Sequence, residues 1–109
     1  MTTNNIKLNL LNSPAINTEL GLKYFNHNTS LYLKILNRFV EKNETLNLNH
    51  LNDNELKKTL HTLKGLTSTL GMLPLTAIIK QLEIKSDKIL INNFTQEMSE
   101  VITNIKNIT

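Results

Sequence analysis

Apolar residues recur along most of this chain at the three- and four-residue spacing of an α-helix. No stretch sustains the alternation of apolar and polar residues that is typical of a half-buried strand. The clearest helix is predicted from Ser30 to about Asn43, with a single apolar face. This face comprises Tyr32, Ile35, Leu36, Phe39 and Val40.

The pattern that precedes this helix is weaker. A short helix is predicted over residues 15–25, because Ile16, Leu20 and Tyr24 share one face. Residues 26–29 are expected to form a break. Residues 1–14 are expected to be an irregular N-terminal segment.

Asn52 and Glu55 have the spacing of a capping box, which predicts the start of a third helix. Its apolar stripe is expected to comprise Leu56, Leu60, Leu63, Thr67 and Leu70. Gly71 is placed to end this helix, and Pro74 is placed to begin a fourth that reaches about Ser86. The fourth helix is expected to bury Leu75, Ile78, Ile79 and Leu82.

A final helix is predicted to begin at Asn93, because Gln96 follows at capping-box spacing. Its apolar face comprises Phe94, Met98, Val101, Ile102 and Ile105. Long helices with short connections predict an all-α fold, an antiparallel up-down-up-down four-helix bundle with a short extra N-terminal helix. The bundle is expected to form one domain over residues 15–109.

Composition narrows the possible classes of protein. The chain has 109 residues and no cysteine, so it offers no disulfide, thiolate nucleophile or cysteine-based zinc site. Its net charge is +3, but Arg38 is its one arginine and its lysines are scattered, so nucleic-acid binding is not expected. No apolar stretch is long enough to span a bilayer, and the first residues do not resemble a signal peptide. A soluble, cytoplasmic protein without membrane insertion is expected.

The predicted third helix carries a histidine outside its apolar stripe. At about 100° per residue, His61 lies roughly 140° from Leu56 and is expected to be exposed. Its neighbours on that side of the helix are Lys57, Lys64, Gly65 and Ser68. A glycine within a helix costs about 1 kcal/mol relative to alanine, so Gly65 indicates clearance for an approaching protein surface. Lys64 places a cation where a phosphate or another anion could bind.

Glu83 is expected to lie level with His61 across the hairpin of the third and fourth helices. Both residues are eleven positions from Met72, near the centre of the turn. The Glu83 carboxylate is therefore expected to accept a hydrogen bond from one imidazole nitrogen, which would aim the other nitrogen outward. A solvated glutamate on the helix flank is the alternative.

The sequence H-T-L-K-G-x-x-x-x-L-G, followed by L-x-x-x-x-x-x-L-E, resembles the histidine phosphotransfer (HPt) domain of two-component phosphorelays. The matching residues are His61, Leu63, Lys64, Gly65, Leu70, Gly71, Leu75, Leu82 and Glu83. Residues Asn28 to Phe39 also resemble the helix that precedes the phospho-acceptor helix in that family. Leu66 departs from the family pattern, which often has a small residue there, and it is expected to pack on a neighbouring helix.

The resemblance implies that His61 accepts a phosphoryl group from a receiver-domain phospho-aspartate and passes it to another receiver. Lys64 would stabilise the phosphoryl group, Gly65 would clear the approach, and Glu83 would bond the imidazole. Lys57 and Ser68 are expected to contact the partner. The implied partners are response-regulator receiver domains and a cognate histidine kinase, with Mg²⁺ brought by the receiver. The chain itself would be a monomeric phosphocarrier without a cofactor, a metal or autokinase activity.

Two alternatives keep the helical fold. The chain could be the phosphorylatable domain of a larger hybrid or chemotaxis-type histidine kinase. It could instead be a helical adaptor that binds a partner without phosphorylation. Among the remaining features, His27 and His50 are expected to be surface residues. The isoleucines Ile84, Ile89 and Ile91 are expected to cap the end of the bundle, with an interaction surface as the alternative.

Overall fold

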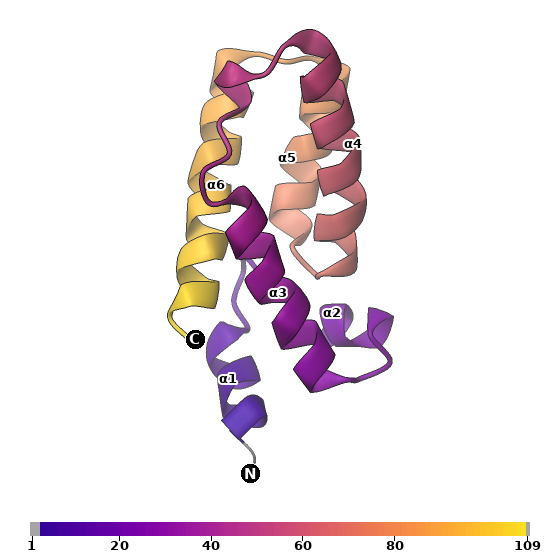
Figure 1. The fold of residues 1–109 in the computed structure, drawn as a ribbon, viewed down its shortest axis with the longest axis vertical. Coiled ribbons are helices and arrows are strands. Elements are labelled where there is room, and N and C mark those ends of the chain that lie inside the picture. The colour runs from indigo at the N-terminus through magenta and orange to yellow at the C-terminus, as the bar shows by residue number, and fades with distance from the viewer. Residues whose placement is uncertain (1–2, 109) are drawn as a thin grey trace.

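A computed structural model describes residues 3–108, which contain α-helices, one short 3₁₀ turn and no strand (Figure 1). The elements are α1 (Thr3–Leu11), α2 (Thr18–Tyr24), α3 (Thr29–Asn43), η1 (Leu48–His50), α4 (Asp53–Thr69), α5 (Leu73–Ile84) and α6 (Lys88–Lys106). The all-α prediction is therefore confirmed for these residues. None of their helices is long and apolar enough to cross a membrane.

The three C-terminal helices run side by side along the long axis of the molecule (Figure 1). α5 packs between α4 and α6, and α3 packs against α6 with a clear tilt relative to these three helices. α1 packs against α3, and α2 contacts both α3 and α4. The result is an elongated body of 46 × 24 × 21 Å.

The apolar stripes of the long helices form one core. Of the residues predicted for these stripes, most are buried, whereas Ile35, Leu56, Ile78 and Ile102 are partly buried at its edge. The amphipathic pattern was therefore sufficient to predict which face of each long helix packs inward. Tyr32 is fully buried, and its hydroxyl donates a hydrogen bond to the Leu70 carbonyl at 2.8 Å. This bond joins α3 to the end of α4.

Both ends of α4 are fixed by local sequence. The Asn52 side chain accepts from the Glu55 amide at 2.9 Å, and the Glu55 carboxylate accepts from the Asn52 amide at 3.0 Å. The predicted capping box is therefore present. At the other end Gly71 has φ +84°, and the Met72 amide donates to the Thr67 carbonyl. This left-handed glycine ends the helix in a Schellman motif.

The prediction of an irregular segment over residues 1–14 is wrong for residues 3–11, which form α1. Residues 1, 2 and 109 lie outside the described part of the chain. Leu8 and Leu11 of α1 are buried in the same core as the other helices, so the boundary predicted at residue 15 does not separate two units. α1 gains its stability from packing on α3, a contact that local sequence does not reveal.

Two helix starts also differ from prediction. α2 begins after Asn17, whose side chain accepts from the Leu20 amide, and Tyr24 is 60% exposed rather than on a buried face. α6 begins after Asp87, whose side chain accepts from the Leu90 amide at 2.8 Å, rather than at Asn93. Asn93 and Gln96 have capping-box spacing but lie inside α6, which explains why the sequence placed the start too late.

Candidate functional site

α4 carries His61 on its solvent side. The helix is uninterrupted from Asp53 to Thr69, so residues three and four positions apart share a face. His61 and Lys57 are exposed, as predicted, while Ser68 is partly buried. No ion pair of Lys57 is present among residues 3–108, which leaves its ammonium free to meet an anion.

Gly65 leaves open space one turn after His61. A Cβ atom built at this position would meet nothing within 4 Å. Gly21 is the opposite case, because a Cβ there would lie 2.5 Å from the Tyr32 hydroxyl. Internal packing therefore explains the glycine in α2, whereas it does not explain Gly65. Since glycine weakens a helix, its presence at an open surface beside the imidazole favours a role in docking.

A buried pair of threonines fixes the register of α4 against α5. The Oγ1 atoms of Thr67 and Thr76 are 2.8 Å apart, and Thr76 Oγ1 also donates to the Met72 carbonyl at 2.9 Å. Thr67 Oγ1 also lies 3.4 Å from the Lys64 carbonyl, so each hydroxyl has a backbone acceptor besides the other threonine, and either can be the donor of the bond between them. This bond holds the hairpin close to the register predicted from the turn, and Glu83 of α5 meets Lys64 of α4.

The structure pairs Glu83 with Lys64. Lys64 Nζ lies 2.8 Å from Glu83 Oε1, and the two side chains are 34% and 26% exposed. No hydrogen bond joins Glu83 to His61 within the described residues, which differs from the expected bond to the imidazole. Lys64 leans toward α5 at the edge of the His61 face. Its ammonium offers the carboxylate a charge-assisted bond that a neutral imidazole cannot match.

Two isoleucines on either side of the connection between α5 and α6 are exposed. Ile84 is 87% exposed at the end of α5, and Ile89 is 73% exposed at the start of α6. The expectation that they cap the bundle end is therefore wrong for these two residues. Only Ile91 packs against the core. Ile84 directly follows Glu83 along α5, so an exposed apolar side chain lies one residue from the charged pair.

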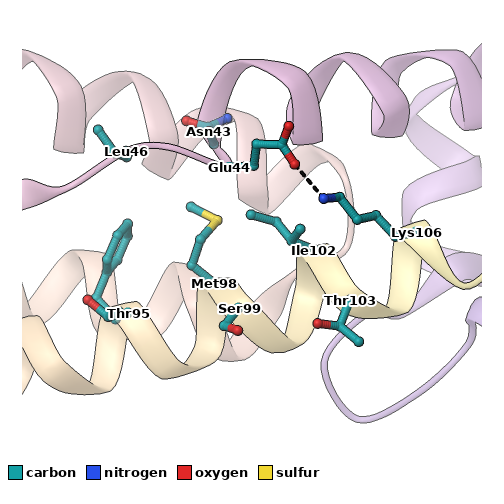
Figure 2. A pocket seen from close by; sticks show the side chains of 10 residues that line it. Asn43, Glu44, Leu46, Thr95, Met98, Ser99, Ile102, Thr103 and Lys106 are labelled. Carbon is teal, nitrogen blue, oxygen red and sulfur yellow. Dashed lines mark ion pairs between the residues drawn. The ribbon is translucent and has the colours of Figure 1, made fainter.

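A hollow of about 260 Å³ lies on a different part of the molecule (Figure 2). It is lined by the end of α3, the segment that follows it and α6, and by no residue of α4 or α5. Phe94, Met98 and Ile102 provide apolar walls, and an ion pair between Glu44 and Lys106, 2.6 Å long, closes one end (Figure 2). This hollow has no histidine and no pair of carboxylates, and its one carboxylate, Glu44, is paired with Lys106.

The predicted exposure of His27 and His50 and the predicted packing of Leu66 are confirmed. His27 and His50 are exposed, and Leu66 is partly buried in a groove with Ile35 and Phe39 of α3. Within residues 3–108, no three histidine, aspartate or glutamate side chains gather closely enough to hold a metal ion.

The comparisons with known proteins found no similarity. No protein-family model, no curated protein and no solved structure matches this chain. Any function must therefore be argued from the site itself.

Proposed function

We propose that this chain is a histidine phosphotransfer module, a signalling phosphocarrier in which His61 accepts and donates a phosphoryl group. The observation that carries the proposal is the exposed imidazole on an uninterrupted helix, with open space at Gly65 on the same face. A partner that must bring a reacting phosphorus to a ring nitrogen needs such access. Lys64 and Lys57 supply positive charge near the ring, which favours an anionic phosphoryl group.

The transfer forms one bond and breaks one bond. An unprotonated imidazole nitrogen of His61 attacks the phosphorus of an aspartyl phosphate on a receiver domain. The bond from phosphorus to the aspartyl oxygen breaks, and the carboxylate leaves with the bonding electrons. The reverse reaction passes the phosphoryl group to the aspartate of a second receiver. Phosphoryl transfer depends mainly on alignment and charge neutralisation, so a rigid helix that presents one nucleophile is sufficient on this side.

In this proposal, α3 to α6 correspond to the four helices of an up-down-up-down bundle, with α1 and α2 as additions at one end. The receiver docks over His61 and Gly65, brings Mg²⁺ and its aspartates, and contacts Lys57 and the exposed Ile84. The chain acts as a cytoplasmic monomer between a cognate histidine kinase and its receivers. The apolar border beside a polar reactive centre suits a transient protein contact.

The test is transfer from a phosphorylated receiver domain to the wild-type chain and to His61→Gln. We expect the label to appear on the wild-type chain and to be lost in the variant. His50→Gln is the matched control, because it removes another exposed histidine outside α4 and should keep the label. Equal labelling of wild type and His61→Gln would refute the assignment.

A helical adaptor that is never phosphorylated is the second candidate. The two exposed isoleucines favour it, because an apolar surface can bind a partner without any chemistry at His61. The adaptor predicts that His61→Ala leaves receiver binding unchanged and that no phosphoryl group is transferred. Isothermal titration with and without phosphorylation of the receiver separates the two candidates.

A further inference from the structure

The Lys64 ammonium is paired with Glu83, although it is also the cation that a phosphoryl group on His61 would contact. Lys64 follows His61 by three positions, so the two side chains are neighbours on the surface of α4. Lys64 Nζ is 2.8 Å from Glu83 Oε1. A phosphoryl group at neutral pH carries between one and two negative charges and three strong acceptor oxygens. It would therefore compete with the Glu83 carboxylate for the same ammonium.

We propose that Glu83 is a positioning residue that competes for Lys64 and thereby disfavours the phosphorylated form of His61. This inference rests on the proposed phosphotransfer function. If Lys64 stays with Glu83, the phosphoryl group loses a neutralising cation. If Lys64 turns to the phosphoryl group, the Glu83 carboxylate is left unpaired near a second anion. Either arrangement raises the free energy of the phosphorylated chain relative to the unmodified one, so the phosphoryl group passes more readily to the receiver.

The size of the effect is limited by solvent. The Lys64 and Glu83 side chains are 34% and 26% exposed, so water screens part of their interaction. Glutamine at position 83 would keep a hydrogen-bond acceptor of similar shape and remove the charge. We therefore expect Glu83→Gln to shift the phosphotransfer equilibrium toward phospho-His61 by about threefold to tenfold.

The experiment measures the equilibrium distribution of the phosphoryl group between the chain and one fixed receiver domain. Glu44→Gln is the matched control, because it makes the same substitution in the Glu44–Lys106 pair, which lies outside α4 and α5. We expect this control to leave the equilibrium at the wild-type value. An equally large shift in Glu44→Gln would overturn the proposal, because the effect would then follow from net charge alone.

A second pair of variants tests whether Glu83 acts through Lys64. In a Lys64→Gln background the competition for the ammonium is gone and only repulsion between anions remains. The effect of Glu83→Gln should therefore be clearly smaller there than in the wild-type background. Equal effects in both backgrounds would show that Lys64 is not shared, and would overturn the proposed competition. Thermal unfolding of each variant checks that all of them are folded.

Phosphoramidate separates failure of this inference from failure of the proposed function. The His61 nitrogen attacks the phosphorus of phosphoramidate, the P–N bond of the reagent breaks, and ammonia leaves with a proton. If wild-type His61 takes no label from phosphoramidate or from the receiver, both proposals fail. If His61 is labelled but Glu83→Gln leaves the equilibrium unchanged, the competition is refuted and the phosphotransfer function stands.

Discussion

Gly65 is the residue at which helix stability and the proposed phosphotransfer function make opposite demands. A β-carbon at this position would meet nothing within 4 Å, so no packing constraint in the described structure requires a glycine. Its helical backbone conformation is one that alanine adopts readily. The residue is therefore best explained by what must approach it from outside, beside His61.

Gly65→Ala should stabilise the chain and slow its transfer reaction. We expect the free energy of unfolding to rise by about 1 kcal/mol, because alanine favours the helix. Transfer from a receiver domain should become roughly tenfold slower, because the new methyl group holds the two proteins apart. Labelling by phosphoramidate, which is small enough to pass the methyl group, should not change. Denaturant titration and the two labelling rates measure these effects, and unaltered transfer from the receiver would contradict the docking role.

The bonding partner of Glu83 is a feature of the candidate site that the sequence does not predict. The turn at Gly71 and the helical repeat predict that His61, Lys64 and Glu83 lie near one another, and the structure joins two of them, Lys64 and Glu83. The partner of the Glu83 carboxylate depends on side-chain conformation and charge, and in the structure that partner is Lys64. Helix periodicity predicts which residues are neighbours on a surface. It does not predict which of two neighbouring donors a carboxylate will bond.

At the scale of elements, local signals decided which helices could be predicted. α4 has a capping box at one end and a left-handed glycine at the other, and its predicted bounds hold. α1 has neither signal, its apolar residues are split between buried and exposed positions, and it is held by contacts with α3. The start of α6 was predicted too late because Asn93 and Gln96 have the spacing of a capping box within the helix, whereas the actual cap is Asp87. Helices that depend on tertiary contacts are the ones that sequence periodicity misses.

Tyr32 joins two of these elements, and its removal should weaken the fold without altering the site. Its buried hydroxyl donates to the Leu70 carbonyl at the end of α4, and burial raises the pKa of the Tyr32 phenol, so this donor stays protonated. Tyr32→Phe leaves that carbonyl without its partner. We expect the free energy of unfolding to fall by about 1–2 kcal/mol.

Tyr24→Phe is the matched control for this change, because Tyr24 is 60% exposed. Its effect on stability should lie within about 0.5 kcal/mol of zero. Chemical denaturation gives both values, and phosphoramidate labelling of His61 should be the same in both variants. Equal stabilities of the two variants would show that the bond from Tyr32 to Leu70 contributes nothing to the fold.

At the scale of the whole molecule, the described residues share a single core that includes the N-terminal helix. Leu8 and Leu11 of α1 belong to the same buried cluster as residues of α3 and α6. A hydrogen bond of 3.2 Å from the Asn104 side chain to Ser13 Oγ also ties the segment after α1 to α6. The site on α4 is therefore supported by contacts that extend through α5, α6 and α3 to the first helix.

Two adjacent leucines test whether α1 belongs to this core. Leu11 is fully buried, whereas Leu10 is 71% exposed on the other side of the same helix. Leu11→Ala should lower the free energy of unfolding by about 2–5 kcal/mol, because it removes buried methyl groups and leaves a cavity. Leu10→Ala should change it by less than about 0.5 kcal/mol. Thermal and denaturant unfolding measure both, and a neutral Leu11→Ala would mean that the first helix does not pack on α3 in solution.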